Sequence, residues 1–112
     1  MMTRMQLLRV YLSEGDRFDG RPAYAALVER LRAAGASGAT VFKGIEGFGS
    51  SGTLRSARVF DLSTDLPIVV EAVESPEKIA ALLPIVHEVL SGGIVTLEGI
   101  EILQLAATEG EG

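Results

Sequence analysis

The sequence predicts an α+β protein in which two helices cover one face of an antiparallel sheet. Stretches rich in β-branched and aromatic residues alternate with two stretches whose apolar residues recur every three or four positions. Their order is strand, helix, strand, strand, helix, strand, which is the ferredoxin-like βαββαβ order. All 112 residues fit one domain. We expect its core at about residues 5–105 and a disordered polar tail at residues 106–112.

Two strands are predicted in the first half of the chain. Residues 5–12 alternate in side-chain direction, with Leu8 and Val10 on one face and Tyr11 on the other. Residues 39–46 are rich in β-branched and aromatic side chains, which is typical of a strand. A polar loop and a helix separate these two strands.

That first helix is predicted over residues 21–34. We expect Asp19 or Gly20 to cap its start, Pro22 to lie in its first turn and Gly35 to stop it. Its apolar stripe consists of Tyr24, Leu27, Val28 and Leu31.

The second half repeats the pattern with a strand, a helix and a strand. The third strand is predicted over residues 66–74, and the Ser-Pro pair at 75–76 then favours a helix start. Apolar residues keep one stripe across Pro84, so we expect this proline to kink the helix rather than end it. Glycines at 92–93 end the helix, and residues 94–105 contain the last strand.

One face of the predicted sheet is left without a cover. In this arrangement the helices cover one face, while Leu7, Tyr11, Val69 and Val73 lie on the other. The chain is 47% hydrophobic, with a mean hydropathy of +0.32, which is high for so small a domain. The simplest cover is another copy of the same chain, so the sequence predicts a homo-oligomer.

Composition argues against several classes of function. The net charge is −5 and no run of Lys or Arg occurs, so we do not expect nucleic acid as a partner. The chain has no cysteine and one histidine, which excludes disulfide frameworks and Cys/His zinc sites. We recognise no targeting segment, and the longest apolar run, residues 79–86, is too short for membrane insertion. We therefore expect a cytoplasmic protein.

The segment that stands out chemically is rich in glycine. Gly47-Phe48-Gly49-Ser50-Ser51-Gly52 matches the pattern G-x-G-x-x-G. A dinucleotide-binding loop of that pattern opens a helix, but residues 53–62 do not look helical, and residues 57–62 suggest an extended arm. Two interpretations remain: a flexible turn between strands, or a mobile loop that approaches an anion or a partner.

Hydroxyl and guanidinium groups accompany these glycines. Serine and threonine hydroxyls can bind phosphate, and two arginines can hold phosphate oxygens through paired hydrogen bonds. The alternative is that the arginines are simply solvated. We predict that residues 47–58 form the ligand-binding or partner-binding segment. Its candidate residues are Gly47, Phe48, Gly49, Ser50, Ser51, Gly52, Thr53, Arg55 and Arg58.

Other chemically active residues do not form a catalytic or metal-binding set. His87 has no serine nearby in sequence, and we expect it to be a partly exposed surface residue. We expect the carboxylates of Asp16, Asp19, Glu71 and Glu74 to be solvated charges of loops and strand edges. The sequence thus predicts neither catalytic residues nor a metal site.

Taken together, these segments resemble the PII-like proteins, and most closely a family of bacterial and archaeal PII-like proteins of unknown function. The resemblance spans residues 5–103. It rests on an ordered set of segments: Leu8-Arg9-Val10-Tyr11-Leu12, Gly38-Ala39-Thr40-Val41, Gly44, Gly47-Phe48-Gly49, Leu66-Pro67-Ile68-Val69-Val70-Glu71 and the helix at 79–84.

The resemblance implies a regulatory homotrimer. In PII proteins a Gly-Phe-Gly stretch leads into the loop that docks on target proteins, and effector nucleotides bind in clefts between subunits. Residues 47–49 would be the base of that loop here, and the target would be a protein such as a membrane transporter or an enzyme. The phosphate-binding loop of PII proteins contains a lysine, whereas residues 91–99 contain none. The effector is therefore left open, as a nucleotide or another anion.

Two alternatives use the same fold. A CutA-like trimer involved in divalent cation tolerance would need metal sites, for which this chain offers chiefly carboxylates. A small enzyme would need clustered titratable groups.

Overall fold

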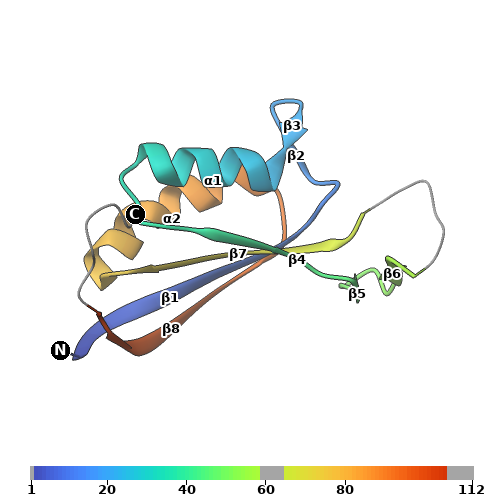
Figure 1. Cartoon of the computed structure of the whole chain (residues 1–112). Coiled ribbons are helices and arrows are strands. Elements are labelled where there is room, and N and C mark those ends of the chain that lie inside the picture. Colours follow the sequence, from blue (N-terminus) through green and yellow to red (C-terminus); the bar gives the residue numbers. More distant parts are fainter. Residues whose placement is uncertain (1, 59–64, 106–112) are drawn as a thin grey trace.

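The computed structural model describes residues 2–58 and 65–105, and it confirms the predicted architecture. A four-stranded antiparallel sheet has the strand order β4-β7-β1-β8. Two helices lie side by side over one of its faces (Figure 1). The main elements are β1 (Met2–Ser13), α1 (Ala23–Ala33), β4 (Thr40–Lys43), β7 (Pro67–Glu74), α2 (Pro76–Val89) and β8 (Ile94–Leu103). The expected tail at 106–112 lies outside the described residues.

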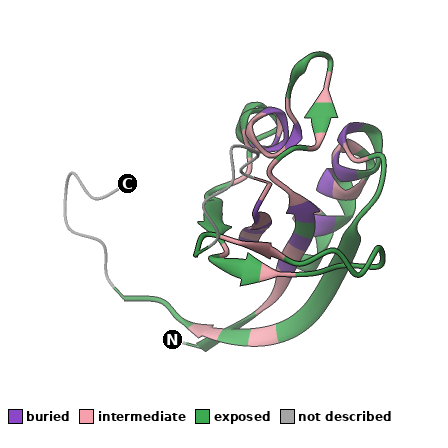
Figure 2. Cartoon of the chain, turned by 90° about the vertical axis from the view of Figure 1, so that its right-hand side faces the viewer, coloured by how far each residue is buried: buried purple, intermediate pink, exposed green. Residues whose placement is uncertain are grey.

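The core forms where the alternating side chains of β1 and β7 meet the helices. Val10 lies opposite Val70, and Leu12 lies opposite Ile68, and all four side chains are buried. Figure 2 shows this buried layer between the helices and the sheet. Burying each such side chain contributes about 1.5–3 kcal/mol. The helices contribute Ala23, Ala26, Leu27, Leu31, Ile79, Leu82, Val86 and Val89 to the same cluster.

Helix α2 begins and continues as predicted. Ser75 is its N-cap residue, and the Ser75 hydroxyl accepts a hydrogen bond from the Lys78 amide at 3.2 Å. The helix runs through Pro84 to Val89, which confirms that this proline does not end it. In the described part of the chain, no helix is long and apolar enough to cross a membrane.

The start of α1 differs from the prediction, whereas its end agrees. Asp19 and Gly20 do not cap the helix. Both have positive φ and form the turn between the short strands β2 (Arg17–Phe18) and β3 (Arg21–Pro22). Pro22, the residue expected in the first turn, is the N-cap residue and supplies no side-chain hydrogen bond.

Gly35 stops α1 as expected. It has a φ of 92°, and its amide donates to the Arg32 carbonyl at 3.1 Å. The next amide, that of Ala36, donates to the Leu31 carbonyl at 3.0 Å. These paired bonds are the usual termination of a helix at a left-handed glycine.

The predicted strand over residues 39–46 is shorter in the structure. It ends at Lys43, and the Gly44 amide then donates to the Pro67 carbonyl at 2.7 Å. The chain next forms a separate hairpin from β5 (Glu46–Gly47) and β6 (Arg55–Ser56). Of the predicted arm at 57–62, residues 59–62 lie outside the described residues.

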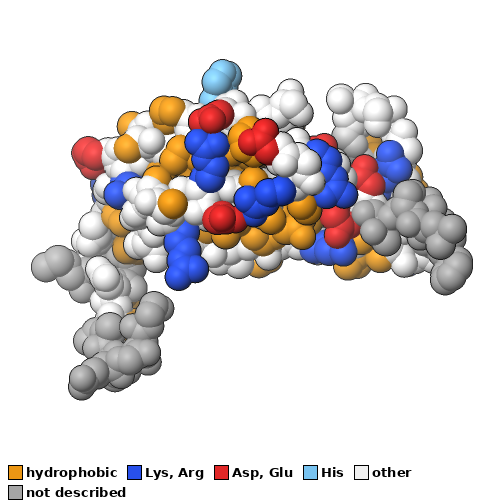
Figure 3. Space-filling model, turned by 90° about the horizontal axis from the view of Figure 1, so that it is seen from above, with side chains coloured by type: hydrophobic (Ala, Val, Ile, Leu, Met, Phe, Trp, Pro, Cys, Tyr) orange, Lys and Arg blue, Asp and Glu red, His pale blue; other side chains and the backbone are white. Residues whose placement is uncertain are grey.

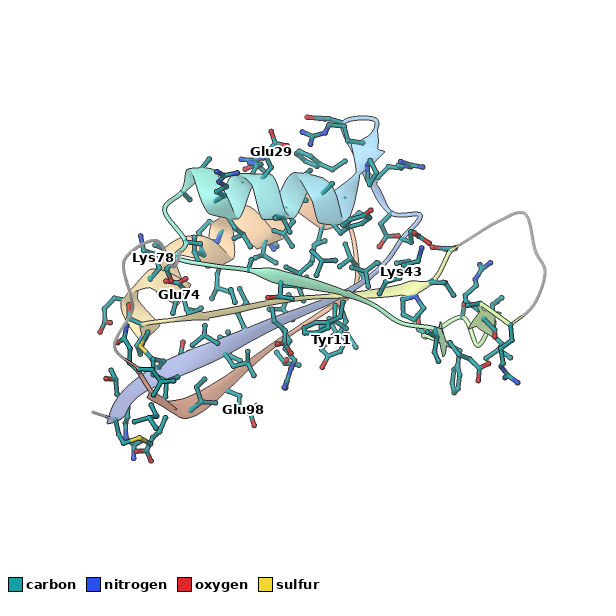
Figure 4. All side chains as sticks on the ribbon, in the orientation of Figure 1. Tyr11, Glu29, Lys43, Glu74, Lys78 and Glu98 are labelled. Carbon is teal, nitrogen blue, oxygen red and sulfur yellow. The ribbon has the colours of Figure 1, made fainter. Side chains whose placement is uncertain are left out.

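The sheet face away from the helices carries the predicted apolar side chains. Tyr11 is 39% exposed there and Val73 is 37% exposed, while Leu7 and Val69 are partly buried. Tyr11 and Glu98 extend away from the helices in Figure 4. Phe42 on β4 and Ile94 on β8 add to this face, because each lies opposite one of its members in the register. We call it the open sheet face.

One ion cluster interrupts the open sheet face. The Arg9 guanidinium donates to Glu71 at 2.8 Å and lies 3.4 Å from a carboxylate oxygen of Glu98. These three residues come from the neighbouring strands β1, β7 and β8. The face therefore combines apolar side chains with charges that are already paired.

Gly93 provides a test of how closely the chain packs where β8 begins. Its φ is 104°, and a Cβ at this position would lie 2.4 Å from the Tyr11 carbonyl oxygen. Gly93→Ala should therefore lower the free energy of unfolding by at least about 2 kcal/mol, as measured by urea denaturation. Gly92→Ala is the matched control, because a Cβ there meets nothing within 4 Å. Equal stability of the two variants would contradict the tight packing described here.

Candidate functional site

The predicted segment 47–58 projects from the end of the sheet as the β5–β6 hairpin (Figure 1). Glu46 lies opposite Ser56, and Gly47 lies opposite Arg55. The Ala57 amide donates to the Ile45 carbonyl at 2.8 Å and extends the pairing by one residue at the base. Eight of the nine candidate residues thus lie in one hairpin and Arg58 directly follows it, although the two-residue strands carry no periodic pattern in the sequence.

Pro67 fixes where the hairpin leaves the sheet. A Cβ on Gly44 would lie 2.7 Å from Pro67 Cγ, and a Cβ on Gly47 would lie 3.1 Å from the same atom. A side chain at Gly44 would clash with the proline ring, and one at Gly47 would be tightly crowded by it. Together with the bond from the Gly44 amide to the Pro67 carbonyl, this contact defines the Pro67 clamp.

Paired charges surround the clamp. Lys43 Nζ lies 2.7 Å from a Glu14 carboxylate oxygen, and this hydrogen bond lowers the pKa of Glu14. Figure 4 shows Lys43 where the sheet approaches the hairpin. Asp65 accepts the Gly15 amide at 2.7 Å and lies 3.9 Å from Nη2 of Arg55. Arg55 is therefore near a carboxylate rather than fully unpaired.

The hairpin exposes apolar side chains from its base to its turn. Ile45 and Phe48 are each 75% exposed, and Leu54 is 57% exposed. The Gly52 amide donates to the Gly49 carbonyl at 2.9 Å, and the Thr53 amide donates to Ser51 Oγ at 3.3 Å. The tip is a turn with its own hydrogen bonds, and its surface is both apolar and polar.

Arg58, two residues after the end of β6, is also paired. Its guanidinium donates to Oε1 of Glu46 through Nε at 2.9 Å and through Nη2. The Ser56 hydroxyl donates to the same oxygen at 2.8 Å. The bonds from Arg58 and then from Ser56 lower the pKa of Glu46. The two arginines predicted to attract an anion thus already face carboxylates of their own chain.

Sequence reasoning missed the residues that pair with these arginines. Glu46 and Ser56 meet Arg58 only because the hairpin register brings them together. Asp65 approaches Arg55 from the segment just before β7. Residue type alone gave no signal for these contacts. Sequence reasoning also missed the exposure of Ile45 and Leu54, because apolar residues of this kind usually belong to the core.

A shallow hollow lies between the end of α2 and the start of β8. Its volume is about 420 Å³ and its apolar wall comes from Leu83, Val86, Leu90 and Val95. His87 also lines it, with Ser91, Gly92 and Gly93. His87 is exposed, as expected from the sequence. Residues 91–93, which begin the stretch expected from the resemblance to correspond to the phosphate-binding loop of PII proteins, line this hollow, and the stretch at 91–99 contains no lysine.

The carboxylates expected to be solvated differ in their surroundings. Glu74 is only 5% exposed and accepts hydrogen bonds from both the amide and the hydroxyl of Ser37, so that prediction was wrong. The alternation of β7 directs Glu74 to the helix side, where Ser37 takes the place of water. Glu71 is partly buried and paired with Arg9. Asp16 accepts the Ser13 amide at 3.0 Å within its own loop.

The helix side of the molecule mixes both signs of charge. Arg30 lies 2.8 Å from Glu88, and Arg21 pairs with Glu29. Figure 3 shows basic and acidic side chains interspersed on this side, without a continuous basic surface. Among residues 2–58 and 65–105, no group of three or more His, Cys, Asp or Glu side chains is arranged to hold a metal ion.

Solved structures share this fold. One is CPII, described as a nitrogen regulatory PII-like protein, from Thiomonas intermedia K12, bound to ADP, AMP and bicarbonate. It superposes with a TM-score of 0.70 at 19% identity over 91% of each chain. Another, named as a PII-like signaling protein, from Thermus thermophilus, gives a TM-score of 0.67 at 21% identity over 91% of this chain and 92% of that chain. The fold is therefore PII-like, as expected.

Sequence relatives extend over nearly the whole chain. A UPF0166 protein of Aquifex aeolicus (strain VF5) is 38% identical over 93% of this chain and 98% of its own length. A UPF0166 protein of Methanocaldococcus jannaschii is also 38% identical, over 86% of this chain and 89% of its own length. Residues 5–102 match the family described as DUF190, Uncharacterized ACR, COG1993. The chain belongs to this family, and it combines the family's sequence with a PII-like fold.

Proposed function

We propose that this chain is a PII-like regulatory protein of the cytoplasm rather than an enzyme. In this proposal it forms a homotrimer and binds a small anionic effector, such as a nucleotide, at clefts between subunits. It then docks on a protein target, a membrane transporter or an enzyme, through the hairpin at 47–58.

The observation that carries the proposal is the display of apolar side chains on a projecting hairpin. Ile45, Phe48 and Leu54 lie mostly in solvent, although nearby apolar side chains of the sheet are buried. Exposed apolar groups on a projecting element are typical of a surface that a partner covers. The Pro67 clamp holds the base of the hairpin, so the display has a defined direction.

The effector is inferred from the chemistry of the loop. CPII shares the fold and was solved with ADP, AMP and bicarbonate, all of which are anions. In this chain the stretch at 91–99 has no lysine to hold phosphate. Arg55 and Arg58 are the arginines of the hairpin, so we assign the phosphate contacts to them.

The trimer is inferred from the open sheet face. Tyr11, Val73, Phe42 and Ile94 expose apolar surface there, next to the ion cluster around Arg9. An apolar face of this kind in a small domain is typical of an interface. Packing the sheets of three copies together would cover this face and leave the helices outside.

Light scattering tests the assembly with a pair of substitutions on opposite sheet faces. The native protein should have a mass about three times its 11.8 kDa chain mass. Val73 and Val41 are both 37% exposed, but Val73 lies on the open face and Val41 on the helix side. Val73→Glu should dissociate the trimer, because a buried unpaired carboxylate is costly, whereas Val41→Glu should leave it intact. A native monomer at micromolar concentration would overturn the assembly, and dissociation by both variants would overturn its assignment to the open face.

Calorimetry with ADP tests the effector site. The double variant Arg55→Ala with Arg58→Ala should weaken ADP binding at least about tenfold, because each arginine supplies charge-assisted hydrogen bonds. Its thermal midpoint should change little, since exposed ion pairs contribute little to stability. The control is Arg4→Ala with Arg32→Ala, which removes two exposed arginines elsewhere. Equal ADP affinity of the native protein and the hairpin double variant would show that these arginines are solvated surface.

A further inference from the structure

Three donors on the hairpin converge on a single oxygen atom. Oε1 of Glu46 accepts from Ser56 Oγ at 2.8 Å, from Arg58 Nε at 2.9 Å and from Arg58 Nη2. The Ser56 hydroxyl is itself oriented, because it accepts the Arg58 amide at 3.1 Å. Its one proton is then directed to Glu46. We call this arrangement of Ser56 and Arg58 the oxyanion cradle.

The cradle has the chemistry of an anion site. A hydroxyl and a guanidinium edge that point to one oxygen are the groups with which proteins bind phosphate and carboxylate ligands. Here the oxygen belongs to Glu46 of the same chain, from the opposite strand of the hairpin. The anion-binding groups are therefore already in place, and a carboxylate of the same chain fills the position that a ligand would take.

We propose that Glu46 is a built-in competitor of the effector, so that an oxyanion must displace the Glu46 carboxylate from Ser56 and Arg58 in order to bind. This autoinhibitory contact rests on the proposed function, since it takes the effector to bind at Arg58. It adds Glu46 and Ser56 to the site and gives each a role.

The exposure of the contact makes such an exchange practicable. The Arg58 side chain is 77% exposed and the Glu46 side chain 37% exposed, so water and dissolved anions reach both. Exposed ion pairs are weak, and removing a competitor of this kind changes a binding constant by about fivefold at most. The cradle can therefore be vacated by a ligand of ordinary affinity. In this exchange Arg58 passes from one anion to another and remains paired. The Glu46 carboxylate leaves Ser56 and Arg58 and becomes solvated.

The test uses Glu46→Gln in the full chain, with inorganic pyrophosphate as the probe. Glutamine has the same shape and keeps an oxygen for Ser56, but it does not hold the guanidinium with a charge. By titration calorimetry at low ionic strength, this variant should bind pyrophosphate about fivefold more tightly than the native protein. Glu101→Gln removes the same charge from an exposed position on β8 and should change the affinity less than twofold.

Two further variants test whether the effect depends on the reach of the Glu46 carboxylate and on the Arg58 guanidinium. Glu46→Asp keeps the charge but shortens the side chain by one methylene group, so it should also bind more tightly than the native protein. In an Arg58→Ala background, Glu46→Gln should have no effect, because the guanidinium for which the two anions compete is gone. Titration with acetate in place of pyrophosphate shows whether the cradle takes carboxylates as well as phosphates.

The outcomes distinguish this inference from the proposed function. If Arg58→Ala loses pyrophosphate binding but Glu46→Gln binds as the native protein does, the arginine site stands and the autoinhibitory contact is wrong. Equal tightening by Glu46→Gln and Glu101→Gln would also overturn it, because the cause would then be net charge. If none of the proteins, Glu46→Gln included, binds pyrophosphate or ADP, both the inference and the effector site are wrong.

Discussion

The sheet and the core of this molecule depend on the pairing of β1 with strands on both of its sides. β1 runs antiparallel to β7 along one edge and to β8 along the other. Because successive side chains of a strand point to opposite faces, this pairing assigns each residue to the helix side or to the open face. A shift of one residue would exchange Val10 with Tyr11 and leave the helices without a core. The core and the open face are consequences of one register.

The hairpin is a different kind of structure, held by electrostatics and by a single proline. Its strands have two residues each, too few for stable pairing by themselves. Pro67 holds the base, and Glu46, Ser56 and Arg58 fasten the two strands. The apolar residues at its tip contribute nothing to the core of this chain. An element with so few internal contacts has low local stability. Partner-binding segments are usually found in such parts of a fold.

The sequence predicted the features of this fold that depend on local patterns. The α2 start at Ser75 and the α1 stop at Gly35 follow from the residue types themselves, and the strands follow from their composition. The hairpin was missed because short strands leave no periodicity, and the Glu46–Arg58 contact because it needs the hairpin register. Glu74 was misjudged because its partner, Ser37, is 37 residues away. The chemistry of the candidate site depends on contacts between residues that are distant in the sequence. Such contacts cannot be predicted from the local pattern of one sequence.

The Pro67 clamp holds the base of the hairpin but makes no contact that limits the length of its turn. A Cβ on Gly49 or Gly52 would meet nothing within 4 Å, so there is open space at both positions of the turn. The entropy of closing a loop rises slowly with length, by about 0.6 kcal/mol for each doubling. Insertions between residues 49 and 52 would therefore leave the clamp, the sheet and the core unchanged. The length and chemistry of the tip can therefore change while the same scaffold is retained.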